Sequence, residues 1–132
     1  MSEVRSNFHR ENTSSELLEE HISFMQTLDC KSAEPYLACA IMQRAEHSNW
    51  PLSQLKYFNQ GKERLEKYIS AHKDDTEARY VRLLVQQGSP SFLGYRGDIS
   101  DDANYILDNL YRCVLPEWLK VNMKNAANEN LN

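Results

Sequence analysis

The stretch EARYVRLLVQQGSPSFLGYRGDISDD, residues 77–102, decides the fold of this chain. It begins with apolar residues at helical spacing, stops at Gly88 and returns to a helical pattern after a loop. That loop carries Phe92, Leu93 and Tyr95, although connections that are exposed to water are usually polar. The loop must therefore either fold back onto the core or present an apolar surface to a partner.

We expect Phe92 and Leu93 to turn inward and fill the space between the two helices, because burying such a side chain contributes about 1.5–3 kcal/mol. Tyr95 would then lie at the rim. Arg79 and Arg82, three residues apart, can pair with acidic residues at the start of the second helix and so fasten the loop. The alternative is that both arginines form an anion-binding point on a concave surface.

The composition predicts a single helical domain over residues 13–124. The chain has 132 residues, of which 41% are hydrophobic, so it is long enough for one core and too short for two comfortable domains. Only four Gly and four Pro occur, and no alternating β-branched run predicts a sheet. The net charge of −4 gives no general attraction to nucleic acid or to an anionic membrane.

The apolar periodicity predicts an all-α fold of five to six helices in antiparallel hairpins. Residues 1–12 are polar and patternless, which predicts a mobile arm, and the Asn-rich residues 125–132 predict a frayed tail. Thr13, Asp74 and Ser100 are the predicted helix N-caps.

Spacing in the middle of the chain indicates tetratricopeptide-like helical hairpins over about residues 33–87. Gly61, Leu65, Tyr68 and Lys73 lie at the repeat's characteristic positions, although Tyr68 and Lys73 are not its usual residue types. Gly61 is inside the longest predicted helix, where glycine suits a place at which a neighbouring helix must come close.

Three segments carry a closer resemblance, namely NWPLSQLKYFNQGKERLEK, TEARYVRLLVQQGSPSFLGY and ISDDANYIL. They resemble a family of small helical proteins from Bacteroidetes bacteria that share a P-x-F-L-G-Y loop. Gln54 and Tyr80 depart from the family pattern, where lysine and phenylalanine are usual. The resemblance implies a helical fold and no particular activity.

The sequence predicts no catalytic residue, no cofactor site and no metal site. The four histidines have no metal-ligand spacing, the three cysteines form no CxxC pair, and the common phosphate-binding and nucleophile motifs are absent. Asp98, Asp101 and Asp102 are interpreted as helix N-terminal capping, in preference to a calcium site. No secretory apolar region and no run long enough to span a membrane occurs, which predicts a cytoplasmic protein.

Two function classes follow. The first is a non-catalytic protein-interaction module that binds a protein or peptide, with no nucleic acid or membrane partner and an oligomeric state that the sequence leaves open. The second is a small-molecule-binding protein or an enzyme with a site near residues 88–98. The candidate partner-binding residues are Tyr57, Arg79, Tyr80, Arg82, Phe92 and Tyr95.

Overall fold

The computed structural model describes residues 1–10 and 14–130, and all regular elements in those ranges are helical. The all-α class is therefore confirmed. The described residues form seven α-helices and four short 3-10 helices, where five to six helices were predicted. The chain divides into two compact units, Met1–Ala71 and His72–Asn132. A single domain over residues 13–124 stays a prediction.

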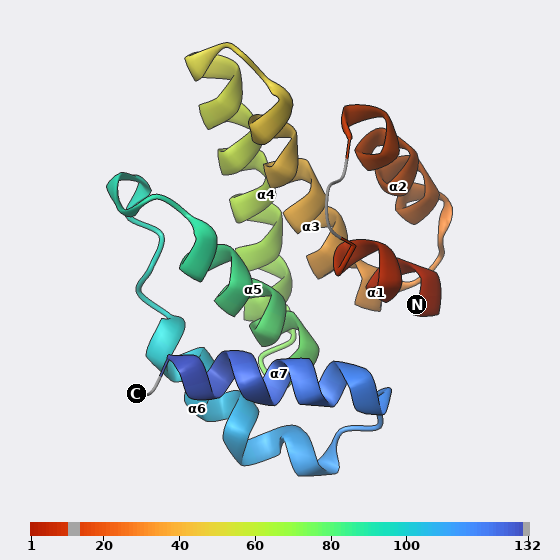
Figure 1. Cartoon of the computed structure of the whole chain (residues 1–132), viewed down its shortest axis with the longest axis vertical. Helices are drawn as coiled ribbons and strands as arrows, with labels where there is room; N and C mark the ends of the chain where they lie inside the picture. Colours follow the sequence, from red (N-terminus) through yellow and green to blue (C-terminus); the bar gives the residue numbers. More distant parts are fainter. Residues whose placement is uncertain (11–13, 131–132) are drawn as a thin grey trace. The chain divides into compact units, whose positions relative to one another are not determined.

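The first unit is built around a long helical pair. Its elements are α1 (Ser2–Phe8), α2 (Ser15–Thr27), η1 (Lys31–Ala33), α3 (Glu34–Gln43), η2 (Arg44–His47) and α4 (Pro51–Ala71). Figure 1 shows α3 and α4 side by side and running in opposite directions. Helices α1 and α2 pack against α3, whose side chains from Pro35 to Met42 are all buried.

The predicted mobile arm is wrong for Ser2–Phe8, which form α1. Val4 is completely buried, and the ring of Phe8 meets the ring of Tyr36 edge to face at 4.9 Å between centroids. Val4 and Phe8 are four residues apart, so they share one helix face. Two apolar residues in a polar stretch are too few to give a periodic signal, and the packing partner lies far along the chain.

The close helix approach predicted at Gly61 is confirmed. A Cβ atom at this position would lie 2.4 Å from the carbonyl oxygen of Ala38 and 2.4 Å from Cγ of Met42, both on α3. Any side chain therefore collides with α3, including its backbone. The absence of a Cβ atom allows the two helices to touch at this point.

The second unit contains three mutually packed helices. Its elements are α5 (Thr76–Gly88), η3 (Ser91–Leu93), α6 (Ile99–Asn109), η4 (Leu110–Arg112) and α7 (Glu117–Glu129). Helix α7 continues through the predicted frayed tail as far as Glu129, with Ala126 and Ala127 buried, so the tail prediction is wrong for residues 125–129. Among the described helices, none combines the length and the apolar character needed to cross a membrane.

Helix starts differ from the predicted caps by one or two residues. Thr13 lies outside the described residues, and α2 is capped by Ser14, whose hydroxyl accepts from the Leu17 N–H at 3.1 Å. Asp75, and not Asp74, caps α5. Helix α6 begins one residue after Asp98 and has no side-chain cap, so the prediction for Ser100 is wrong.

We predict that Gly61→Ala destabilises the first unit by about 1–3 kcal/mol, because the added methyl group overpacks the contact with Ala38 and Met42. Helix propensity alone predicts the opposite sign, a gain of about 1 kcal/mol. Urea unfolding of the variant measures the difference. A midpoint at or above that of the wild type contradicts the close approach, and Gly88→Ala is the matched control because a Cβ atom there meets nothing within 4 Å.

His21 gives the first unit a pH-dependent stability. Burial, followed by the charge of Arg10, lowers the pKa of His21 below its ordinary value of 6.5, while Glu3 acts in the opposite direction. The unfolded chain therefore binds a proton to His21 more readily than the folded chain does. Stability is lost as the pH falls below 6.5 and continues to fall until the folded pKa is reached.

We predict that His21→Gln removes this part of the acid sensitivity, which amounts to at most about 1.4 kcal/mol per pH unit. Urea melts of both proteins on either side of pH 6.5 measure it. His47→Gln, at an exposed histidine of the same unit, is the control for replacing an imidazole with an amide. A constant gap between wild type and His21→Gln at all pH values would show that His21 is not the titrating group.

Candidate functional site

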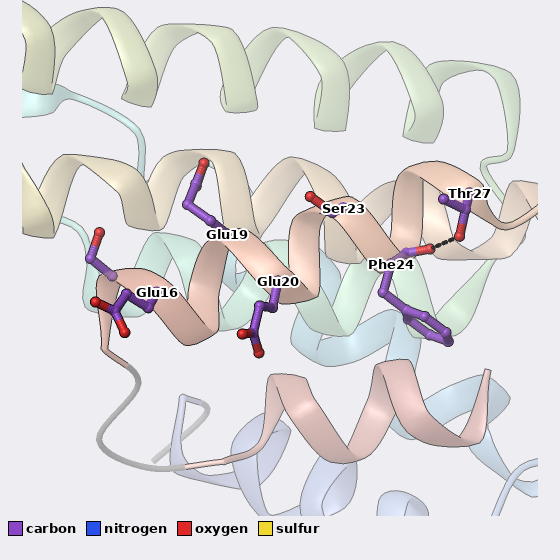
Figure 2. A pocket seen from close by; sticks show the side chains of 7 residues that line it. Glu16, Glu19, Glu20, Ser23, Phe24 and Thr27 are labelled. Carbon is purple, nitrogen blue, oxygen red and sulfur yellow. Dashed lines mark hydrogen bonds between the residues drawn. The ribbon is translucent and has the colours of Figure 1, made fainter.

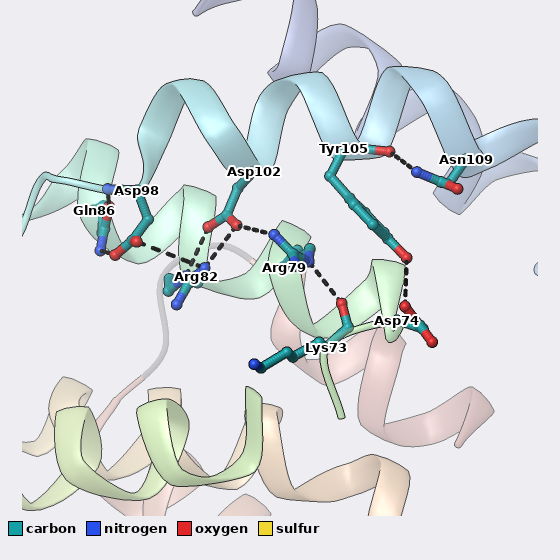
Figure 3. A network of polar contacts seen from close by, with 9 residues as sticks. All are labelled: Lys73, Asp74, Arg79, Arg82, Gln86, Asp98, Asp102, Tyr105 and Asn109. Carbon is teal, nitrogen blue, oxygen red and sulfur yellow. Dashed lines mark hydrogen bonds and ion pairs between the residues drawn. The ribbon is translucent and has the colours of Figure 1, made fainter. Parts of the chain in front are cut away.

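A buried ion pair joins α5 to α6 in the second unit. Arg82 on α5 donates from Nε to Oδ2 of Asp102 at 2.7 Å and from Nη2 to Oδ1 at 2.8 Å. The Asp102 side chain is fully buried and Arg82 is 7% exposed. Figure 3 shows both side chains meeting between the two helices. This two-pronged contact is the geometry in which a guanidinium binds a carboxylate most strongly.

Arg79 lies one turn earlier on α5 and extends the contact. Its Nη1 donates to Oδ1 of Asp102 at 3.2 Å, and its Nε donates to the carbonyl of Lys73 at 2.9 Å. The guanidinium also lies 4.1 Å from the ring centroid of Tyr105 on α6. Tyr105 donates its hydroxyl to Oδ1 of Asp74 at 3.4 Å. The start of α5 is thus tied to α6 as well (Figure 3).

The predicted fastening role of the two arginines is therefore confirmed. Burial raises the pKa of Asp102, while hydrogen bonds and charge from Arg82 and the charge of Arg79 partly offset that rise. Both guanidinium groups carry only donors, so the contact needs an ionised Asp102 as acceptor. With the carboxylate occupying both arginines, the alternative of an anion-binding point would require an external anion to compete with a bonded internal one.

The interpretation of the aspartates as residues of a helix N-terminus is confirmed in position, since Asp98 is the N-cap residue of α6 and Asp101 and Asp102 lie in its first turn, but none of them makes a side-chain cap hydrogen bond. Asp102 is the acceptor of the buried ion pair, and Asp98 makes no cap hydrogen bond with its side chain. Instead, Oδ2 of Asp98 accepts from Nε2 of Gln86 at 2.9 Å, and the backbone N–H of Asp98 donates to Oε1 of Gln86 at 2.9 Å. Gln86 is fully buried, and this double contact closes the base of the loop.

Three further hydrogen bonds hold the loop at its first residues. Nη1 of Arg96 donates to the carbonyl oxygens of Gln86 at 3.3 Å and Ser89 at 3.1 Å. The hydroxyl of Ser89 donates to the carbonyl of Val85 at 2.6 Å. These bonds satisfy carbonyl groups at the end of α5, which the helix itself leaves without partners. The loop over residues 89–98 is therefore attached along its base.

The apolar residues of the loop are arranged opposite to the prediction. Tyr95 is buried, with 5% exposed, whereas Phe92 is 85% exposed and Leu93 is half-buried. Gly94, with φ of 69°, follows the single 3-10 turn of η3 and reverses the chain. That reversal returns Tyr95 to the core and leaves Phe92 at the tip, so the prediction of a Phe92 plug is wrong.

The remaining predicted residues differ in burial and belong to both units. Tyr80 is 2% exposed, and burial raises its pKa to about 12, which is the behaviour of a core tyrosine. Tyr57 belongs to α4 of the first unit, where it is half-buried and lies 5.9 Å from the guanidinium of Arg44. The structure brings Arg79 and Arg82 together at Asp102. Phe92 alone of the six candidates is largely exposed.

Tyr57 lines an open hollow of about 750 Å³ in the first unit. Tyr57 is its one lining residue among the six predicted candidates, although Trp50 before Pro51 is a further usable signal, because the turn there presents an indole that is 74% exposed. Arg44 spans the hollow to Glu19 with two bonds of 2.9 Å. The other lining residues are Ser15, Leu18, His47, Ser48, Asn49 and Ser53.

A second open hollow, of about 710 Å³, lies along α2. Figure 2 shows Glu16, Glu19 and Glu20 on this helix together with Phe24 and Thr27. Thr27 bonds to the carbonyl of Phe24 at 2.7 Å, so its hydroxyl is used by the helix end. In the described part of the chain, no three histidine, cysteine or acidic side chains are grouped so that they could hold a metal ion.

Comparison with known proteins returned no matching family model, no matching curated protein and no matching solved structure. The candidate site therefore stands on its own geometry, which consists of an exposed Phe92 on a loop that a buried polar network holds in place.

We predict that Asp102→Asn destabilises the second unit by about 3–5 kcal/mol, because it removes the two-pronged counter-charge of the buried Arg82 and leaves Asp98 at 3.8 Å. Asp101→Asn is the matched control, since Asp101 is exposed and its loss should change stability by no more than about 0.5 kcal/mol. Urea or thermal unfolding measures both. Equal effects of the two substitutions would mean that the ion pair does not hold the unit together.

Proposed function

We propose that this chain is a non-catalytic helical module that binds another protein or a peptide, and that Phe92 is its central contact. The carrying observation is that Phe92 is 85% exposed at the tip of a loop whose base is held by hydrogen bonds. Burying a phenylalanine in an apolar pocket contributes about 1.5–3 kcal/mol. A partner that offers such a pocket therefore gains the free energy of burying Phe92, which the folding of this chain does not use.

The hydrogen bonds at the base of the loop favour partner binding, because a loop that is already ordered loses little conformational entropy when a partner binds. Asp98 and Gln86 fix the C-terminal end of the loop, and Arg96 and Ser89 fix its start. Large aromatic side chains that are displayed on a firm support are typical energetic centres of protein interfaces.

The alternative, a small-molecule site or an enzyme near residues 88–98, receives less support. The polar groups that would have to bind a ligand there already bind one another, as the bonds among Arg82, Asp98, Asp102 and Gln86 indicate. A ligand would need to displace buried contacts before it could use these groups.

The proposal also includes the arrangement of the helices and the cellular location of the protein. We infer tetratricopeptide-like hairpins from the α3 and α4 pair, in which Gly61 occupies the position of the repeat's small residue. The resemblance to the Bacteroidetes family rests partly on the loop that carries Phe92, which agrees with a shared role for this loop. A cytoplasmic location is inferred from the sequence, together with a protein or peptide partner and not nucleic acid or membrane.

We predict that Phe92→Ala abolishes partner capture and leaves stability within about 0.5 kcal/mol of the wild type, because the side chain makes little contact within the fold. Tyr95→Ala should instead cost about 3–5 kcal/mol, because Tyr95 is buried. Thermal melts separate the two effects. Benzoylphenylalanine placed at position 92 should crosslink a protein that Phe92→Ala fails to capture.

The matched control is benzoylphenylalanine at Leu52, which is 84% exposed in the first unit. The same crosslinked proteins from both positions would indicate nonspecific contact and would contradict the proposal. Capture of an unchanged set of proteins by Phe92→Ala would contradict it as well.

A further inference from the structure

Helix α1 contacts both α2 and α3 and so covers the groove between these two packed helices. It has seven residues, and Met1 provides no side-chain cap at its start. Isolated helices of this length do not form in water, because nucleation costs more than so few hydrogen bonds return. The helix therefore depends on its packing against the rest of the first unit, in which Val4 and Phe8 take part.

The groove beneath α1 has the features of a site that binds a short amphipathic helix. Val4 is fully buried, and Phe8 packs edge to face on Tyr36 of α3. These two anchors are four residues apart, so they project from the same helix face. Side chains at this spacing are the usual means by which a short amphipathic helix binds a hydrophobic groove.

The polar part of the groove is incompletely satisfied by α1. The His21 side chain is 6% exposed, and its Nδ1 lies 3.4 Å from Nδ2 of Asn7, a long contact. Its Nε2 is buried and has no hydrogen-bond partner among the described residues. A buried polar atom without a partner is unfavourable, and a ligand that supplied one would remove that penalty.

We propose that the groove between α2 and α3 is a second binding site, which accepts a short amphipathic helix of a partner protein, and that α1 occupies it in cis. The incoming helix carries an aliphatic side chain at the place of Val4, an aromatic side chain four residues later at the place of Phe8, and a polar group that reaches Nε2 of His21. Binding releases α1. This site is in the first unit and does not depend on the Phe92 loop.

The test uses the full chain and a synthetic peptide with the sequence of residues 1–10, which carries the same two anchors. Val4→Asp in the chain should release α1, because a charge cannot remain at a fully buried position. The peptide is titrated at millimolar concentration, since the tethered α1 competes at an effective concentration of that order. Backbone amide shifts of His21 and Tyr36 report occupation of the groove.

We expect the peptide to bind the Val4→Asp chain about tenfold or more tightly than the wild type, because the wild-type groove is mostly occupied by α1. The same peptide with Val4→Asp should not bind either chain. Phe8→Ala in the chain is a milder release of α1, for use where Val4→Asp unfolds the first unit.

Two results overturn the proposal. The first is a folded Phe8→Ala or Val4→Asp chain whose His21 and Tyr36 amides do not respond to the peptide. The second is a wild-type dimer in light scattering that Val4→Asp dissolves, since α1 of a second copy would then be the occupant of the groove. Neither result changes capture through Phe92, so the two proposals can fail separately.

Discussion

The contact between Arg82 and Asp102 sets the geometry of the second unit. Removing both charges from water is expensive, so a buried ion pair is rarely retained for stability alone. The pair instead fixes the position of α5 relative to α6, because a bidentate contact forms only when both groups meet at one angle and one distance. It therefore fixes which turn of α5 faces which turn of α6, and with it the start and end points of the intervening loop.

The loop conformation follows from those end points. Once Gln86 and Asp98 are joined at its base, the chain must leave and return within a short span. Gly94 makes that return possible through its left-handed backbone, which other residues adopt at a cost. The residue after the reversal returns to the core and the residues before it remain outside. The positions of Tyr95 and Phe92 therefore result from the polar network and the turn, not from their relative hydrophobicity.

This explains which parts of the fold could be predicted from the sequence. The start of α4 at Pro51, the end of α5 at Gly88 and the helix contact at Gly61 each follow from a residue with a strong backbone or steric preference. The pairing of Arg79 and Arg82 with an acidic residue of α6 was also foreseeable from charge. Such signals are local, so a sequence reveals them without knowledge of the tertiary structure.

The errors arose where neighbouring residues offer equal local signals. Asp74 and Asp75 are both good capping residues, so only the structure decides which one begins α5. Phe92 and Tyr95 are both large and aromatic, and a direction reversal between them decides which one is buried. Helix α1 was missed for a related reason, since its stabilising partner, Tyr36, is remote in sequence. Tertiary context outweighs weak local preference in all three cases.

The two units also differ in how completely their buried polar atoms are paired, and this difference bears on where each can change. In the second unit, the carboxylate of Asp102 and the amide of Gln86 both have partners, so a rearrangement there would break several charge-assisted or buried bonds at once. In the first unit, Nε2 of His21 has no partner among the described residues, and the short helix α1 packs beside it through Val4 and Phe8. Local opening follows the weakest set of contacts. The structure thus combines a loop that is fixed in place and carries an exposed Phe92 with a short covering helix, α1, that lies over a buried polar atom without a partner among the described residues.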